Sequence, residues 1–108
     1  MIRTATLIAP RPLMAGDLVI DPQTGTAGFA KSATAAGAVA EISTGQGFVL
    51  TVADAAGAAA PGVPVYLVNG VPCFARSRPD DPQCAEVVAL MGRDAEAGTA
   101  RVMVRLAG

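Results

Sequence analysis

The chain has 108 residues, which is enough for one domain and too few for a second hydrophobic core. Hydrophobic residues make up 52% of it but aromatic residues only 4%, so the core must be built mainly from Val, Leu, Ile and Ala. A formal net charge of -1 argues against binding nucleic acid or an anionic membrane, and the absence of histidine excludes Ser-His-Asp catalysis, Cys-His catalysis and histidine metal sites.

Glycine or proline interrupts the chain about every 8 to 12 residues, and the short apolar runs between the breaks are typical of an all-β sandwich or barrel. The predicted strands are residues 4–8, 17–20, 28–31, 38–42, 48–52, 63–68, 71–75, 85–91 and 100–106. In the last of these, Arg101 and Arg105 alternate with Val102 and Val104, which predicts one exposed face and one buried face.

Turn residues separate several of these strands. Residues 21–25 (DPQTG) predict a chain reversal, because proline fixes φ and glycine tolerates the reversed backbone. Residues 44–48 (TGQGF) also predict a turn, since neither the lysine nor the helix of a phosphate-binding loop follows them. Residues 53–60 (ADAAGAAA) favour one short helical turn, and a flexible linker is the alternative.

Asn69 and Gly70 predict a two-residue type I′ turn between the strands at 63–68 and 71–75. Tyr66, the only tyrosine, lies in the first strand of this hairpin. We interpret Tyr66, Asn69 and Gly70 as packing and turn residues of the hairpin and not as a catalytic site.

Few residues suggest chemistry. Cys73 and Cys84 are interpreted as free thiols, with a disulfide or a reactive thiol as the alternatives. A weak calcium site would require the fold to bring together acidic residues of two loops, namely Asp80, Asp81, Asp94 and Glu96. No residue pattern indicates a cofactor.

The most charged stretch is residues 76–81, here called the charged loop, which carries Arg76, Arg78, Asp80 and Asp81. It is either a solvated loop or a docking loop that pairs with complementary charges on a partner.

Over residues 9–106, a series of glycine-led strands and small-residue turns resembles one known family in order and spacing. The matching segments are Ala15-Gly16-Asp17-Leu18-Val19, Ala35-Ala36-Gly37-Ala38-Val39-Ala40-Glu41-Ile42, Gly47-Phe48-Val49-Leu50, Gly62-Val63-Pro64-Val65-Tyr66, Val87-Val88-Ala89-Leu90-Met91-Gly92, Asp94-Ala95-Glu96-Ala97-Gly98 and Val102-Met103-Val104-Arg105-Leu106. In this order the chain is similar to the small capsid cement, or head decoration, proteins of tailed bacteriophages.

The resemblance implies an all-β fold, a small β-barrel or β-tulip-like sandwich, with residues 14–108 as its single β domain. It implies a structural protein and not an enzyme, which binds the major capsid protein on the outside of the head and bridges neighbouring subunits. It also implies self-association as a homotrimer at threefold and quasi-threefold positions. The expected location is the outer capsid surface of the virion, after synthesis in the host cytoplasm, with no cofactor, nucleic acid or membrane as a partner.

Residues 1–13 carry two prolines and few charges, and we expect them to form an extended N-terminal arm that orders only on binding. The candidate capsid-contact residues lie in this arm and in the charged loop; they are Ile2, Arg3, Thr4, Leu7, Ile8, Arg11, Arg76, Arg78, Asp80 and Asp81.

Two other functions are compatible with the residues. The first is a small β-barrel binding module of a phage tail or spike that contacts a host-surface ligand, although the low aromatic content argues against a sugar site. The second is an enzyme with a cysteine nucleophile.

Overall fold

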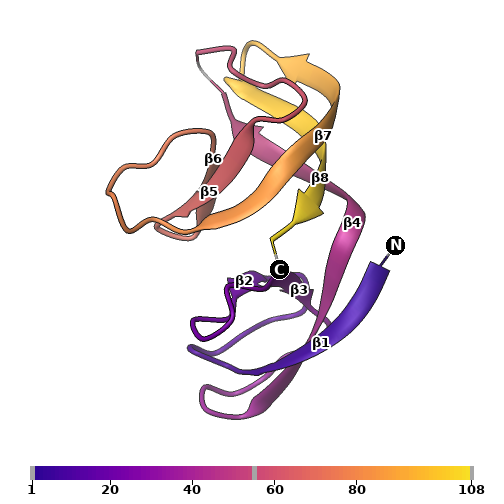
Figure 1. Cartoon of the computed structure of the whole chain (residues 1–108), viewed down its shortest axis with the longest axis vertical. Helices are drawn as coiled ribbons and strands as arrows, with labels where there is room; N and C mark the ends of the chain where they lie inside the picture. The colour runs from indigo at the N-terminus through magenta and orange to yellow at the C-terminus, as the bar shows by residue number, and fades with distance from the viewer. Residues whose placement is uncertain (1, 55, 108) are drawn as a thin grey trace.

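The computed structural model describes residues 2–54 and 56–107 and shows an all-β chain (Figure 1). The described residues form strands and no helix, which confirms the predicted fold class of a small β-barrel. The strands are β1 (Ile2–Ile8), β2 (Leu18–Ile20), β3 (Ala27–Ala30), β4 (Val39–Ala53), β5 (Pro64–Val68), β6 (Val71–Cys73), β7 (Gln83–Asp94) and β8 (Thr99–Leu106). No helix capable of spanning a membrane occurs in residues 2–54 or 56–107.

The second part of β4 and strands β5 to β8 form a closed barrel. The strand order is β4-β6-β5-β7-β8, and β8 returns to pair with β4. A parallel pairing of Ala53 with Cys73 joins β4 to β6 and completes the ring. Along β8 the alternation is as predicted, because Val102 and Val104 are buried while Arg101 and Arg105 are exposed. We call these strands the barrel.

The first part of β4 is the central strand of a smaller sheet, here called the N-terminal half. Strand β1 pairs with one edge of β4, β3 pairs with the other edge, and β2 pairs with β3. In Figure 1 this half lies below the barrel, and β4 is the strand that runs through both. The N-terminal half and the barrel are therefore parts of one continuous sheet.

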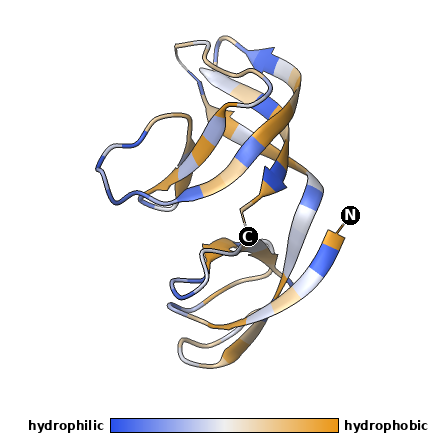
Figure 2. Ribbon diagram, in the orientation of Figure 1, coloured by the Kyte–Doolittle hydropathy of each residue, from blue (hydrophilic) through white to orange (hydrophobic). Residues whose placement is uncertain are grey.

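The expectation that the N-terminal arm is free is wrong for residues 2–8. Strand β1 is extended as predicted, but its residues pair antiparallel with β4 from Ile2↔Gly45 to Ile8↔Val39. The strand is apolar at its first residue and polar at the next (Figure 2). Leu7 faces inward and is buried, and this burial together with the backbone pairing explains why the segment is ordered without a partner.

The turn predicted at residues 44–48 is also wrong, because β4 continues through it. Two predicted strands, 38–42 and 48–52, are one strand of 15 residues. A β-bulge lies between Gln46 and Phe48, and the two glycines around it have φ of +107° at Gly45 and +96° at Gly47. Positive φ at these positions redirects the strand without ending it. We call residues 45–47 the glycine bulge.

The prediction of a single core is a third error. The barrel has one cluster of buried apolar side chains, centred on residues such as Val52, Val65 and Val104. The N-terminal half has a second cluster that includes Leu7 and Ile42. Both clusters consist largely of Ala, Val, Leu and Ile, and such small side chains fill narrow layers in each half.

The N-terminal half and the barrel meet near the glycine bulge. Phe29 of β3 packs against Phe48 of β4, with ring centroids 5.2 Å apart. The Thr44 hydroxyl donates a buried hydrogen bond of 2.7 Å to the Ala27 carbonyl, and the Ala27 amide donates one of 2.8 Å to the Ala107 carbonyl. These contacts hold the N-terminal half against the end of the barrel.

Two predicted turns are confirmed. Asn69 and Gly70 have φ of +50° and +80°, as a type I′ turn requires, and they connect β5 to β6 through the pair Val68↔Val71. Residues 21–25 reverse the chain between β2 and β3, where the Gly25 amide donates to the Asp21 carbonyl at 2.8 Å.

The helical turn predicted for residues 53–60 is absent from the described part of this segment; Ala55 lies outside the described residues. The Asp54 carboxylate accepts hydrogen bonds from the amides of Ala58 and Ala59, at 2.6 and 3.2 Å. Arg93 donates to the carbonyl of Ala59 at 2.8 Å. These side-chain contacts satisfy backbone groups that a helix would have paired internally.

Replacement of Gly47 by alanine is expected to lower the free energy of unfolding by about 1 to 3 kcal/mol, because alanine is strained at φ +96° although no neighbouring atom blocks its Cβ. Urea denaturation measures the change. The matched control is Gln46→Ala, which alters the exposed residue between the two glycines and should change stability by less than about 0.5 kcal/mol. Equal stabilities for the two variants would show that the glycine bulge does not require glycine.

Candidate functional site

The charged loop is held in shape by Asp81. The Asp81 carboxylate accepts hydrogen bonds from the amides of Ser77 and Arg78, at 2.8 and 2.7 Å, and its side chain is only 5% exposed. The Asp81 carbonyl accepts a bond of 3.0 Å from Nε of Arg76. Asp81 was predicted to contact the capsid, but this burial makes it a structural residue of the loop.

Arg76 connects the loop to the hairpin. Its guanidinium lies over the Tyr66 ring, 4.4 Å from the centroid, in a cation–π contact. Tyr66 is half-buried on β5, which agrees with its prediction as a packing residue. Since one face of the ring is covered by Arg76, that face is not available to stack on a sugar.

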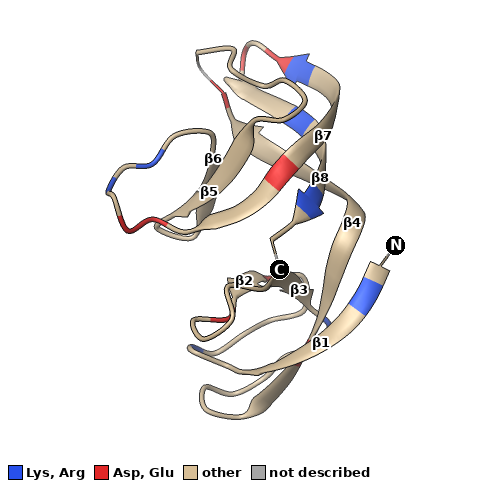
Figure 3. Cartoon of the chain, viewed as in Figure 1, with Lys and Arg blue, Asp and Glu red and all other residues tan. Residues whose placement is uncertain are grey.

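Arg78 and Asp80 are charged residues of the loop whose side chains make no hydrogen bond with the described residues and are open to a partner. Their side chains are 67% and 84% exposed. The ion pairs from Arg78 to Asp80 and to Asp81 are long, at 4.0 Å, and weak at such exposure. Figure 3 shows the loop projecting from the barrel with both signs of charge along it.

On β1 the predicted contact residues divide into exposed and buried ones. Ile2 and Ile8 are 61% and 58% exposed, whereas Leu7 belongs to the core and is not available for contact. The Thr4 hydroxyl is exposed and accepts a bond of 2.6 Å from the Lys31 ammonium. Ile8 faces its cross-strand partner Val39, which is 66% exposed.

We call Ile8 and Val39 the apolar pair. They line a pocket of about 290 Å³ together with the turn at residues 21–23. Both side chains are exposed and adjacent, so they are available for contact with a partner. Val39 was not predicted as a contact residue, because its place opposite Ile8 depends on the register of β1 with β4.

Arg11 lies beyond β1 and is engaged within the chain. Its guanidinium pairs with the Asp17 carboxylate at 3.3 Å and donates to the Leu18 carbonyl at 3.4 Å. The Met14 amide donates to the same carboxylate at 2.9 Å and, together with Arg11, lowers the pKa of Asp17 below its usual value. These bonds fix the segment between β1 and β2, so Arg11 is less available to a partner than predicted.

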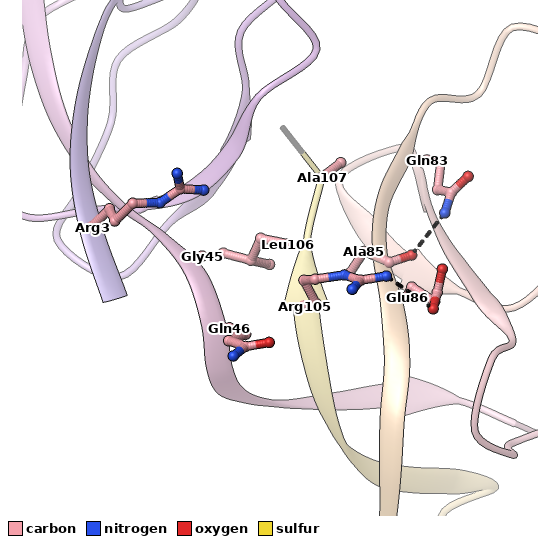
Figure 4. Close-up of a pocket in the computed structure, with 9 residues that line it drawn as sticks. All are labelled: Arg3, Gly45, Gln46, Gln83, Ala85, Glu86, Arg105, Leu106 and Ala107. Atoms are coloured by element: carbon pink, nitrogen blue, oxygen red, sulfur yellow. Dashed lines mark hydrogen bonds and ion pairs between the residues drawn. The ribbon is translucent and has the colours of Figure 1, made fainter. Parts of the chain in front are cut away.

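Arg3, the remaining residue predicted on β1, lines a pocket of about 380 Å³ where the N-terminal half meets the barrel (Figure 4). We call this the junction pocket. Its other lining residues are Gly45, Gln46, Gln83, Ala85, Glu86, Arg105, Leu106 and Ala107. The alternation of β8 predicted that Arg105 is exposed, but only the folded chain brings β7 and β8 near β1.

The cysteines are free thiols, on strands that flank β5 from opposite sides. Tyr66 pairs with Cys73 on β6 and with Gln83, the neighbour of Cys84, on β7. Because β6 and β7 are two strand spacings apart, the Cα atoms of Cys73 and Cys84 are separated by roughly 9 to 10 Å. A disulfide requires a Cα separation of less than about 7 Å. A Cys73–Cys84 bond would therefore require the backbone to move.

The acidic residues proposed for a calcium site are not brought together. Asp81 caps the charged loop, while the Asp94 carboxylate accepts bonds from the amides of Glu96 and Ala97, both at 3.1 Å. The described residues contain no group of three or more potential metal ligands.

The comparisons with known proteins identify no relative. No protein family model matches the chain, and neither the curated proteins nor the solved structures contain a significant match.

Asp81→Ala is expected to lower the free energy of unfolding by about 1 to 2 kcal/mol, because the amides of Ser77 and Arg78 lose their acceptor. Thermal and urea unfolding measure the loss. The matched control is Asp80→Ala, which removes an adjacent carboxylate that accepts no hydrogen bond among the described residues and should leave stability nearly unchanged. An Asp81→Ala protein as stable as this control would contradict the assigned role.

Burial raises the pKa of the Cys84 thiol from its usual 9.0 to about 11. Between these values the unfolded chain has lost a proton that the folded chain keeps, so the free energy of unfolding should fall as pH rises from about 9 to about 11. Cys84→Ala should reduce this fall more than Cys73→Ala, because burial of Cys84 is the largest cause of its raised pKa and the charge of Cys73 is a smaller one. In native protein a thiol reagent should modify the partly exposed Cys73 before Cys84. Equal reaction rates, or the same pH dependence in both variants, would contradict the environment assigned to Cys84.

Proposed function

We propose that the protein is a structural component of a bacteriophage head that binds the outer surface of the capsid and bridges neighbouring major capsid subunits. The order of its glycine-led strands supports the proposal through the resemblance to capsid cement proteins. The all-β fold agrees with that resemblance in class.

The observation that carries the proposal is that exposed candidate contacts occur on both parts of the molecule. The apolar pair, Ile8 and Val39, lies on the N-terminal half, and Arg78 and Asp80 lie on the charged loop of the barrel. In Figure 3 the charged loop projects to one side from the barrel, and β1 lies in the N-terminal half below it. A body with two separate contact surfaces can touch two neighbours at once, which is what bridging requires.

The apolar pair and the charged loop would each make a weak contact, and such contacts suit a protein that binds at many equivalent sites. The apolar pair offers a small area of apolar surface, and the exposed charges of the loop favour orientation and selectivity more than affinity. Repetition over a shell, with copies of the protein also touching one another as trimers at threefold and quasi-threefold positions, would add these contacts into a stable assembly.

Binding to empty expanded heads of the cognate phage tests the proposal. The parent protein should sediment with heads at a ratio that matches their threefold positions. A double variant of the apolar pair, Ile8→Ser with Val39→Ser, and a double variant of the loop, Arg78→Ala with Asp80→Ala, should each weaken binding by about three- to tenfold. The four changes together should abolish it.

The matched control is Val88→Ser, which removes an apolar side chain of similar exposure, 47%, from the outside of the barrel and should bind like the parent. Each variant is first shown to be folded by its unfolding transition. Failure of the folded parent to bind heads, or binding by the fourfold variant at parental affinity, would overturn the proposal.

A further inference from the structure

The junction pocket is built from both parts of the molecule. Arg3 comes from β1, Gly45 and Gln46 come from β4 at the glycine bulge, and Arg105 comes from β8. In Figure 4, Arg3 extends from one wall toward the end of β8, while Arg105 lies on the opposite wall and points toward Glu86 of β7. A ligand in this pocket would therefore contact the N-terminal half and the barrel together.

The charges of the pocket are not balanced. Arg105 donates to the Glu86 carboxylate at 3.2 Å, so these two charges neutralise each other. Arg3 makes no hydrogen bond or ion pair with any residue in 2–54 or 56–107. Two arginines and one glutamate leave the lining with a net charge of +1, which belongs to the exposed guanidinium of Arg3.

The remaining polar groups are mainly hydrogen-bond donors and side-chain amides. Arg105 uses one nitrogen on Glu86, so its other N–H groups are open. Gln83 donates to the Ala85 carbonyl at 3.2 Å, and Gln46 has no hydrogen bond with the described residues. Planar guanidinium groups with free donors bind carboxylates in two-point geometry.

We propose that the junction pocket binds an acidic segment of a protein partner, with one carboxylate of that segment on Arg3. The single positive charge of the lining matches one carboxylate. A phosphate dianion would exceed that charge and would leave a net negative charge in a pocket that also contains Glu86. The segment belongs to a major capsid subunit, and this source rests on the proposed function; the chemistry of the pocket does not rest on it.

A pocket of about 380 Å³ has room for an acidic side chain together with the backbone on either side of it. The segment would lie across the end of β8, between the wall that carries Arg3 and the wall that carries Arg105. This arrangement gives the arm residue Arg3 a role in binding although β1 is a paired strand.

The test uses two capped pentapeptides, acetyl-Gly-Ser-Glu-Ser-Gly-amide and its Gln analogue, added to the ¹⁵N-labelled protein. The Glu peptide should shift the amide resonances of Gly45, Gln46 and Ala107 and the side-chain Nε–H of Arg3, and the Gln analogue should not. Affinity should fall about three- to fivefold in Arg3→Gln, as expected for one exposed ion pair. In Glu86→Gln, which frees Arg105, affinity should rise by about two- to threefold.

The matched control is Arg101→Gln. Arg101 faces outward on β8 like Arg105, but it does not line the junction pocket, so its loss should leave the affinity for the Glu peptide unchanged. Titration with inorganic phosphate is the second control.

Three results would overturn the inference: equal shifts with both peptides, equal affinity in Arg3→Gln and Arg101→Gln, or tighter Arg3-dependent binding of phosphate than of the Glu peptide. No capsid is present in this experiment, so its outcome is independent of the head-binding test. Peptide binding can be absent while the protein still binds heads, and it can be present while the protein does not bind heads.

Discussion

Strand β4 is the constraint on which the rest of the structure depends. It is the only described strand that pairs in both the N-terminal half and the barrel. It pairs with β1 near the start of the chain and with β8 near its end. The glycine bulge allows one strand to serve two sheets of different curvature, because positive φ at Gly45 and Gly47 redirects the backbone while pairing continues on either side. Two of the proposed contact surfaces take their positions from this strand, and the third is linked to it by one pairing. The junction pocket lies beside the bulge, the apolar pair includes its first residue, and the charged loop follows a strand, β6, that is anchored to its last residue.

Local signals in the sequence predicted the elements well and their assembly poorly. The hairpin at Asn69 and Gly70 and the two faces of β8 depend on neighbours along the chain, so pattern and turn chemistry were sufficient to find them. Residues 44–48 were interpreted as a turn because their glycines did not fit a phosphate-binding loop. A bulge uses glycine in the same way, and only the pairing of β4 with β8 distinguishes a bulge from a turn. The short, alanine-rich segment 53–60 favoured a helix by propensity. In the fold, the side chains of Asp54 and Arg93 bind backbone groups of this segment instead.

Residue type also failed to separate contact residues from structural ones. Asp80 and Asp81 are adjacent and chemically identical, yet one is exposed and the other is buried as the acceptor of two amides. Leu7 and Ile8 show the same division on β1, because successive side chains of a strand point to opposite faces. The junction pocket could not be predicted from the sequence for a different reason. Arg3 and Arg105 are separated by most of the chain, and no local pattern indicates that they share a cavity.

The closure of the barrel has a consequence for how the molecule opens. Strands β7 and β8 are joined along most of their length, but β4 and β6 are joined by the single pairing of Ala53 with Cys73. Regions held by few backbone bonds open at lower free energy than the fold as a whole. Hydrogen exchange should therefore begin along this seam, and the barrel would first become a curled open sheet that still contains β7 and β8. A partner that bound across the seam would slow this local unfolding, and so it would stabilise the barrel without contacting its core.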